Sequence, residues 1–373
     1  MTDKIGFLIT STGWGGLELN VLRLAGWLNE RGWKVTLYAL KDSKIYANAK
    51  DYPVMLESIE NHRKYFDFKA AFRFGKKLKE AVIERIMIFD NRDLDFMFLT
   101  KRILSNKIKV IYQQHMLVGV SKRDWLHTLR FSAIDYWISP LDLLKKEVMA
   151  KTHLEPSKIK VIPLGTETEK FIKAKYSKEE ARRKLNIKTK APLIGIMGRI
   201  DPKKGQLFLT KAVNELKKVG VKVELLVLGE PTVNDPEAGI YYSELIDFIA
   251  ANNLSEKIHL RGFTNDVSMF YNAIDVFALA SHGETYGMVT IEAMLSQIPI
   301  IATNSAGTPE ILNFGELGEL YEYENLDDFC SKLVKILQHP DESREIAIKA
   351  GTQAQTRFSH ITESEQIEKL LIA

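Results

Sequence analysis

The stretch Ser281–Thr303, "SHGETYGMVTIEAMLSQIPIIAT", contains a turn, a helix and a strand in immediate succession. Gly287 ends the turn, residues 288–295 have the pattern of a helix, and the apolar run 298–303 has that of a buried strand. A helix followed at once by an apolar strand is typical of parallel α/β folds. The stretch also raises a question. Glu284 stands just before the helix and Glu292 inside it, with seven residues between the two carboxylates.

The same alternation continues on both sides of this stretch. Between residues 171 and 357, further strand-like runs occur at 191–200, 221–229, 257–263 and 275–281. From residue 1 to 170, such runs occur at 4–10, 33–40, 85–90, 109–115, 136–140 and 159–165. The expected fold class is α/β, with two doubly wound Rossmann-like domains facing a central cleft. The carboxyl ends of the strands would line that cleft, where ligands bind in such folds.

The composition is that of an ordinary globular protein, with 45% hydrophobic and 27% charged residues in a chain of 373. Cys330 is the one cysteine, so an internal disulfide is excluded and a reducing compartment is expected. The first residues, "MTDKIGFLITSTGWGG", lack the features of a signal peptide, and no apolar run has the length of a membrane span. We therefore expect a cytoplasmic protein.

The net charge of +4 is unevenly distributed. Residues 1–170 carry 29 Lys and Arg against 20 Asp and Glu, a net of +9, whereas the remaining residues carry 23 against 28, a net of −5. Segment 61–82 holds seven basic residues and five Phe or Tyr, and segment 121–131 mixes Trp125 and two leucines with three basic residues. This pattern favours an anionic surface, the inner face of the cell membrane, over nucleic acid, for which no recognition motif is present. The alternative is that the aromatic residues are core and the lysines are merely solvated.

Two turns are candidates for binding a phosphate. In Thr12–Glu18, Gly15 and Gly16 stand between a strand and a helix, where backbone amides can approach an anion. The spacing does not match a dinucleotide fingerprint, and the alternative is an ordinary tight turn.

The second candidate turn is Gly198–Gly205, "GRIDPKKG", between a strand and a helix. Arg199 and either Lys203 or Lys204 suit a diphosphate, because arginine offers a planar fork and lysine a movable charge. The alternative is a solvated basic loop.

The opening stretch suits the same ligand. Gly287 lets the chain turn into the helix, so the amides of Met288 and Val289 point out of its positive end, towards a phosphate. Glu284 and Glu292 can then accept from neutral hydroxyls, of a sugar and of a ribose respectively. A nucleotide-diphosphate sugar offers all of these groups. The alternative is a helix start with two solvated glutamates.

Two further features come from the first half of the chain. His115 ends a predicted strand and is either an active-site residue or a packed core histidine. Asp93 and Asp95 form an Asp-x-Asp sequence, which we do not expect to bind a metal, because the two-domain pattern argues against the architecture that uses such a site.

Together these motifs resemble a known family. "GRIDPKKG" (198–205), "ETYGMVTIE" (284–292) and "SAGTPEIL" (305–312) match, in order and spacing, the GT-B retaining glycosyltransferases of family 4. The resemblance extends to "GGLE" (15–18) and "VIPLGTETEKF" (161–171), and so covers almost the whole chain. Two positions depart from the family pattern, because Gln297 and Ala306 stand where glycine is usual.

The resemblance implies roles for the matching residues. Arg199 and Lys204 would bind the donor diphosphate and stabilise the departing nucleotide. Glu284 would hold the sugar hydroxyls, Glu292 the ribose, and His115 would contact the donor sugar. The expected catalytic residues are thus His115, Arg199, Lys204 and Glu284. The expected donor-binding residues are Gly15, Gly16, Arg199, Lys204, Glu284, Tyr286, Gly287, Met288, Val289 and Glu292. Neither a metal nor a cofactor is expected.

The resemblance also implies a division of labour. Residues 1–170 would form an acceptor-binding domain, to which the C-terminal helix in 358–373 returns, and residues 171–357 a donor-binding domain. The expected enzyme is a metal-independent retaining hexosyltransferase. It would move a sugar from a UDP- or GDP-sugar to a saccharide or lipid-linked saccharide in bacterial envelope polysaccharide or lipopolysaccharide synthesis. Three alternatives stay open: a soluble small-molecule acceptor, a nucleotide-sugar epimerase, and a non-catalytic nucleotide-sugar binding protein.

Overall fold

The computed structural model describes residues 3–63, 65–232, 235–264 and 266–373. Lys64, one of the seven basic residues of segment 61–82, lies outside the described residues. The chain divides into two compact units, Met1–Thr166 with Phe358–Ala373 and Glu167–Arg357. The first boundary falls four residues before the expected one at residue 170.

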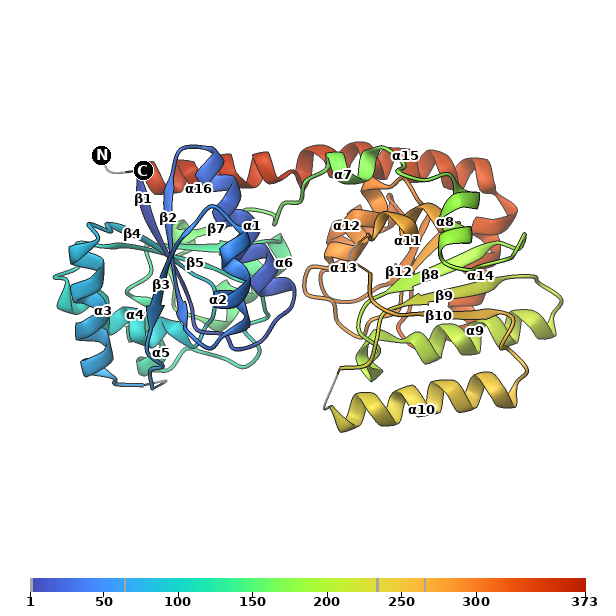
Figure 1. The fold of residues 1–373 in the computed structure, drawn as a ribbon, viewed down its shortest axis with the longest axis horizontal. Helices are drawn as coiled ribbons and strands as arrows, with labels where there is room; N and C mark the ends of the chain where they lie inside the picture. Colours follow the sequence, from blue (N-terminus) through green and yellow to red (C-terminus); the bar gives the residue numbers. More distant parts are fainter. Residues whose placement is uncertain (1–2, 64, 233–234, 265) are drawn as a thin grey trace. The chain divides into compact units, whose positions relative to one another are not determined.

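The first unit is built on a parallel sheet of seven strands in the order β3-β2-β1-β4-β5-β6-β7. These strands are β1 (Lys4–Ile9), β2 (Lys34–Leu40), β3 (Met55–Ile59), β4 (Arg85–Ile88), β5 (Lys109–Gln113), β6 (Tyr136–Ser139) and β7 (Ile159–Val161). The helices are α1 (Gly16–Glu30), α2 (Lys44–Asn48), α3 (Phe68–Glu80), α4 (Asp93–Ile103), α5 (Trp125–Phe131), α6 (Asp142–Lys151) and α16 (His360–Ile372), with short 3-10 helices η1 (Ala49–Asp51) and η2 (Pro156–Lys158). Figure 1 shows helices on both faces of this sheet.

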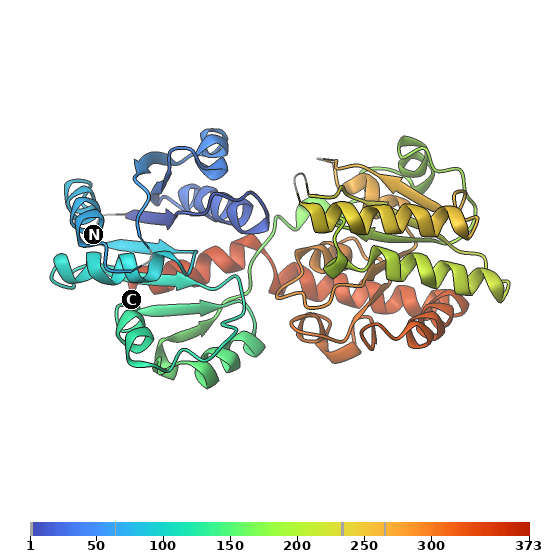
Figure 2. The same ribbon diagram turned by 90° about the horizontal axis from the view of Figure 1, so that it is seen from below.

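The second unit has a parallel sheet of six strands in the order β10-β9-β8-β11-β12-β13. These are β8 (Leu193–Met197), β9 (Glu224–Leu228), β10 (Ile258–Arg261), β11 (Val276–Leu279), β12 (Ile300–Thr303) and β13 (Glu319–Tyr321). The helices are α7 (Glu169–Ile172), α8 (Lys178–Lys184), α9 (Gln206–Lys218), α10 (Pro236–Ala251), α11 (Ser268–Ala273), α12 (Met288–Leu295), α13 (Thr308–Ile311), α14 (Leu326–Gln338) and α15 (Pro340–Arg357), with η3 (Pro202–Lys204) and η4 (Asn313–Gly315). Figure 2 shows the layers of each unit from a second direction.

Successive side chains of a strand point to opposite faces of its sheet, so each sheet has an apolar core on both faces. Ile5, Phe7 and Ile9 of β1 lie in a core shared with α1, α2 and α16, and Leu8 lies in the opposite core with α3 and α4. In the second unit a Cβ on Gly195 of β8 would come 2.6 Å from Ile274, so the segment after α11 packs closely because this position is glycine. The expected α/β class with two Rossmann-like parallel sheets is thus confirmed.

Two edge strands, β3 and β13, were not predicted from the sequence. β3 alternates exposed and half-buried residues, and β13 has only three residues, so neither forms a continuous apolar run. Edge strands bury less side-chain surface than central ones, and their hydrophobic signal is correspondingly weak.

The C-terminal helix α16 packs in the first unit. Ile367 and Leu371 lie in its core, and the His360 ring is 5.2 Å from that of Trp27. The Thr166 amide donates to the Phe358 carbonyl at 2.9 Å, so the two segments that connect the units are paired to each other. Within the described part of the chain, no helix combines the length and the apolar character needed to span a membrane.

Candidate functional site

Two loops of the second unit meet at the carboxyl ends of β8 and β11. Loop 198–205 leads from β8 to α9, and loop 280–287 leads from β11 to α12. The His282 amide donates to the Lys203 carbonyl at 2.9 Å. Gly205 has φ +80°, and a Cβ there would come 2.4 Å from the Ala280 carbonyl oxygen. The loops therefore pack backbone against backbone, and only glycine fits at this contact.

Lys204 and Glu284, one from each loop, form an ion pair. Lys204 Nζ lies 2.7 Å from Glu284 Oε2, and the side chains are 29% and 22% exposed. The Glu284 backbone is also fixed, because its carbonyl accepts from the Gly307 amide at 3.1 Å. A partly exposed pair of this kind contributes roughly 1 kcal/mol or less. A ligand that offers a phosphate to the lysine and a hydroxyl to the glutamate can therefore replace the pair at little cost.

The start of α12 lies directly behind Glu284. Gly287 caps the helix with φ +73°, and a Cβ there would come 3.0 Å from Glu284 Cγ. Tyr286, which precedes Gly287, is buried. Met288 and Val289 are the first two helical residues, so their amides have no acceptor within the helix. These two amides present the positive end of the helix dipole.

Arg199 is positioned by its backbone and has a movable head. Its carbonyl accepts from Gln206 Nε2 at 2.8 Å. The side chain is 69% exposed, and its ion pair with Asp201 is long, at 3.9 Å. It can thus move to an anion near the loop.

Glu292 is oriented by a residue that sequence reasoning missed. The Tyr271 hydroxyl, from α11, donates to Glu292 Oε2 at 2.8 Å and lies 3.1 Å from the Val289 carbonyl oxygen. Burial, with the neighbouring Glu292 charge, raises the pKa of Tyr271 well above its usual value. Tyr271 therefore stays a hydrogen-bond donor and fixes the carboxylate. No sequence signal linked these residues, which are 21 positions apart.

The remaining predicted residues belong to the first unit. Gly15 has an extended backbone (φ −173°), and a Cβ on Gly16 would meet nothing within 4 Å. The glycine turn therefore leaves open space at the start of α1. However, the buried carboxylate of Glu18 already lies in the first turn of α1, where it accepts from the Ser11 hydroxyl. A negative charge is thus already present near this positive helix end, which favours an uncharged ligand group over a phosphate.

His115 follows β5, and its surroundings keep it uncharged. Burial lowers the pKa of its ring to about 4. In the described structure its Nε2 is buried and makes no hydrogen bond. The preceding Gln114 is held by Trp137 and Ser139, which both donate to its side-chain oxygen, at 3.0 and 2.8 Å. This anchors the loop that carries the histidine.

The Asp-x-Asp sequence is buried and hydrogen-bonded to protein. Asp93 accepts from the Thr10 amide at 3.1 Å and lies 3.0 Å from His62 Nε2, while Asp95 accepts from the Phe66 amide at 3.0 Å. Both carboxylates thus stabilise the first unit. Within the described ranges, no group of three or more His, Cys, Asp or Glu is arranged to hold a metal ion.

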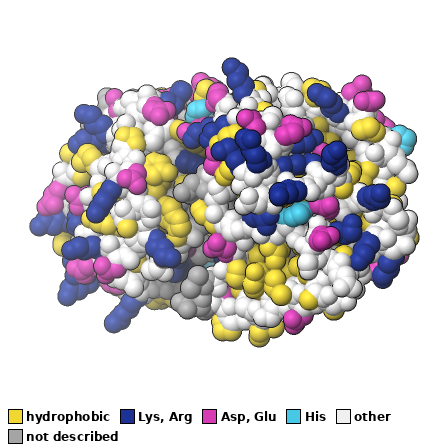
Figure 3. All heavy atoms as spheres, turned by 45° about the vertical axis from the view of Figure 1, so that its right-hand side comes forward, with side chains coloured by type: hydrophobic (Ala, Val, Ile, Leu, Met, Phe, Trp, Pro, Cys, Tyr) yellow, Lys and Arg dark blue, Asp and Glu magenta, His cyan; other side chains and the backbone are white. Residues whose placement is uncertain are grey.

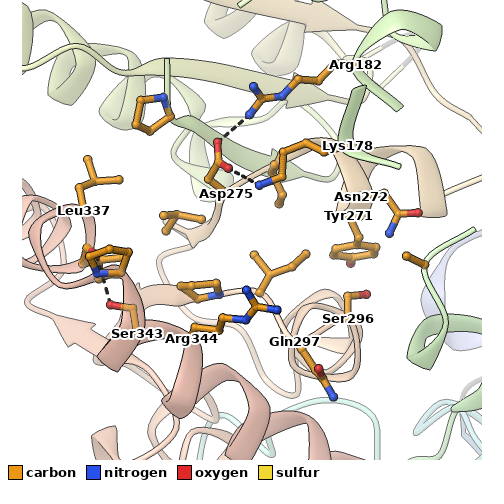
Figure 4. A pocket seen from close by; sticks show the side chains of 18 of the residues that line it. Lys178, Arg182, Tyr271, Asn272, Asp275, Ser296, Gln297, Leu337, Ser343 and Arg344 are labelled. Atoms are coloured by element: carbon orange, nitrogen blue, oxygen red, sulfur yellow. Dashed lines mark hydrogen bonds and ion pairs between the residues drawn. The ribbon is translucent and has the colours of Figure 1, made fainter. Parts of the chain in front are cut away.

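A wide cavity of about 830 Å³ lies elsewhere in the second unit (Figure 4). It is lined by Pro192 and Pro299, which precede β8 and β12, and so opens at the amino ends of the parallel strands. Lys178 and Arg182 at its wall are each 2.6 Å from Asp275, which neutralises part of their charge. This cavity is separate from the loops around Lys204. On the face of the molecule drawn in Figure 3, basic side chains are interspersed with acidic and apolar ones.

The two departures from the family pattern adopt the backbone that glycine would. Gln297 has φ +53° and Ala306 φ +48°. Gln297 follows the end of α12, where its amide donates to Met294 and the next amide, Ile298, donates to Ala293. This is a Schellman motif, whose left-handed residue is usually glycine. The geometry is kept although the residues differ.

Two family models match the chain. "Glycosyltransferase Family 4" matches residues 14–170, and "Glycosyl transferases group 1" matches residues 177–354. The two matches correspond to the two units of the fold and together leave only short segments unmatched.

Individual proteins agree with the family models. The chain is 26% identical over 220 residues to a D-inositol 3-phosphate glycosyltransferase of Corynebacterium kroppenstedtii, covering 58% of this chain and 48% of that protein. It is 28% identical over 195 residues to the UDP-Gal:alpha-D-GlcNAc-diphosphoundecaprenol alpha-1,3-galactosyltransferase of Escherichia coli, covering 51% and 48%. The chain thus spans about half the length of these curated relatives.

A solved structure shares the fold over its full length. Anabaena Alr3699/HepE in complex with UDP and glucose superposes with a TM-score of 0.82, at 19% identity, over 99% of both chains. Two parallel Rossmann-like sheets, two matching family models and this neighbour lead to one conclusion. The chain belongs to the GT-B glycosyltransferases of family 4.

Proposed function

We propose that this protein is a retaining, metal-independent hexosyltransferase. It transfers a sugar from a UDP- or GDP-sugar to a saccharide or lipid-linked saccharide of bacterial envelope polysaccharide or lipopolysaccharide synthesis, at the cytoplasmic face of the membrane. The observation that carries the proposal is the Lys204–Glu284 pair at 2.7 Å beside the open amides of α12. The names of similar proteins support it, since they include a UDP-sugar donor, a diphosphate-linked lipid acceptor and bound UDP with glucose.

In this proposal, donor binding opens the ion pair. Lys204 turns to the diphosphate, and Glu284 accepts a hydrogen bond from a sugar hydroxyl. Arg199 moves to the same diphosphate, and the amides of Met288 and Val289 face it. Negative charge grows on the leaving phosphate as the glycosidic bond breaks, and these groups stabilise it where it develops.

The neutral state of His115 is consistent with a role at the sugar, whereas the groups above act at the leaving phosphate. Positive charge develops at the anomeric carbon in glycosyl transfer. A protonated imidazole beside the sugar would oppose that charge. With its pKa lowered to about 4 by burial, His115 instead offers an uncharged hydrogen bond to a sugar hydroxyl near neutral pH.

An exposed surface on α3 supports the membrane part of the proposal. Phe68 and Phe72 are 61% and 63% exposed, whereas Phe74 is buried in the core. Thus only part of the aromatic content of segment 61–82 is structural. Phe72 also lines a groove of about 520 Å³, together with Lys76 and Lys79. Apolar side chains between lysines suit an anionic lipid surface.

Incubation of the protein with UDP- and GDP-sugars distinguishes this proposal from the alternatives. A transferase forms a glycoside with lipid-linked acceptors, and a soluble-acceptor enzyme forms one with small sugars or sugar phosphates. An epimerase releases an altered sugar without any acceptor, and a binding protein gives a thermal shift without turnover. Absence of both thermal shift and turnover with every donor would refute the proposal.

A further inference from the structure

A small cavity in the first unit is lined by a buried arginine. The cavity measures about 100 Å³ and lies between the loop after β5 and helix α5, with Arg130 and Lys122 in its wall. Met116, Leu117 and Val118 of the wall directly follow His115. The cavity thus adjoins the loop that carries the predicted active-site histidine. This volume exceeds the roughly 10–15 Å³ that one buried water needs, so a small polar group fits in it.

Arg130 is only partly satisfied by the protein. The residue is 4% exposed, and its described hydrogen bond runs from Nη2 to the Asn91 carbonyl at 3.3 Å. Nε is buried and makes no hydrogen bond. It lies 3.8 Å from Asp95 Oδ1, which is beyond hydrogen-bonding distance. The guanidinium also stacks on the Tyr65 ring, with its carbon 5.4 Å from the ring centroid. A buried guanidinium with unused donors is costly unless a further acceptor is present.

The charges around the cavity favour an anion. Arg130 and Lys122 are its cations, and among the described residues no Asp or Glu forms part of its wall. The His127 ring at the wall is paired with Asp124 at 2.6 Å, outside the lining. Asp95 is not part of the wall and offsets part of the Arg130 charge from 3.8 Å, so the described wall itself offers Arg130 no anionic partner. Aromatic and aliphatic side chains form the rest of the wall, and their low polarity strengthens an ionic contact.

We propose that this cavity binds the phosphate group of the acceptor. The inference rests on the proposed function and makes it more specific, because the acceptor is then a saccharide that carries a phosphate group, either on the sugar itself or through its lipid link. Arginine suits this task because its planar fork matches phosphate oxygens. The neighbouring loop would then hold the acceptor near His115.

Phosphorus NMR of the full chain tests the inference. Inorganic phosphate is titrated into protein saturated with UDP, so that the donor site is already filled. We expect saturable broadening of the phosphate resonance. Arg130→Met should weaken this binding at least tenfold, and Arg123→Met, an exposed arginine on the same segment, should leave it unchanged. The UDP resonances report the donor site in the same tube, so failure of the proposed function is seen separately.

A second variant tests the inference in case Arg130→Met does not fold. Leu117 is 45% exposed at the cavity wall, so Leu117→Glu adds a carboxylate there without disturbing the core. It should also weaken phosphate binding at least tenfold. Two arms identify the source of the phosphate: glucose 6-phosphate against glucose, and phosphatidylcholine vesicles with and without polyprenyl phosphate. Phosphate binding that is absent from the UDP-saturated protein, or equal in the folded variants, would overturn the inference.

Discussion

Two ion pairs, one in each unit, lie in opposite environments. In the second unit, Lys204 and Glu284 meet at 2.7 Å while 29% and 22% exposed. In the first, Arg130 and Asp95 are 4% and 2% exposed and stand 3.8 Å apart. A partly exposed pair opens at a cost of roughly 1 kcal/mol or less, whereas separating a buried pair leaves an uncompensated charge. The Lys204–Glu284 pair is thus suited to rearrangement by a ligand, and the Arg130–Asp95 pair to staying in place.

The largest effect should come from the basic surface of the first unit. Changing Lys69, Arg73, Lys76 and Lys77 to Glu should abolish sedimentation with anionic vesicles. Each cation near such a surface contributes roughly 1 kcal/mol, so four reversals weaken binding about a thousandfold or more.

The matched control is the set of four exposed lysines on and after α9 in the second unit: Lys211, Lys217, Lys218 and Lys222. Their reversal should leave sedimentation unchanged. Equal losses from both sets would mean that net charge, and not the first unit, drives membrane binding.

Lys204 offers the next largest effect. In Lys204→Met, kcat should fall about 100- to 1,000-fold while the donor Kd changes much less, because the cation meets charge that grows in the transition state. Steady-state kinetics with a donor-binding titration would separate the two. Lys203→Met is the control, since this neighbouring side chain is exposed and its backbone carbonyl carries the contact to His282. An identical loss in both variants would contradict the assignment.

Glu363 is a further buried acidic group of the first unit, and its titration tests how burial of such a group affects stability. Burial raises the pKa of this carboxyl to about 7, although the Gly165 amide and Gln113 donate to it, at 2.7 and 2.8 Å. The folded-state pKa thus exceeds the unfolded one, so the stabilising contribution is complete below the unfolded pKa. It is lost as pH rises through about 7.

Glu363→Gln should therefore unfold with a free energy higher than that of the parent protein by roughly 1–3 kcal/mol at pH 8, and the gain should shrink by pH 5. Urea denaturation at both pH values measures it. Glu365→Gln, on the exposed side of the same helix, should show no such pH dependence. A gain that is the same at both pH values would disprove the explanation.

The smallest effect concerns the exposed pair itself. Glu284→Gln removes the charge that competes with phosphate for Lys204, so UDP should bind a few-fold more tightly, as expected for loss of a pair of 0.2–1 kcal/mol. Transfer from the UDP-sugar should fall, because the sugar hydroxyl loses a charged acceptor. Calorimetry with UDP checks the first expectation, and weaker UDP binding would show that Glu284 does not restrain Lys204.

Much of the fold and part of the site could be predicted from the sequence. Central strands such as β1 and β8 are apolar runs that can be recognised from a few consecutive residues. Gly287 likewise marks a turn whose positive φ depends on that one residue. The Lys204–Glu284 pair, Tyr271 behind Glu292 and Arg130 near the His115 loop could not be predicted. Each depends on residues far apart in the chain that the topology brings together. Burial also depends on residues that are far apart in the chain. The lowered pKa of His115 and the raised pKa of Glu363 could therefore not be predicted from the sequence.

The stereochemistry of donor cleavage tests the central claim most directly. The protein is incubated with an α-configured UDP-sugar, with water as the acceptor, and proton NMR follows the first sugar released before it mutarotates. We predict that the α anomer forms first, and that Lys204→Met slows its formation without changing the configuration. The β anomer forming first, or release of an epimerised sugar, would contradict retaining transfer from a donor held by Lys204 and Glu284.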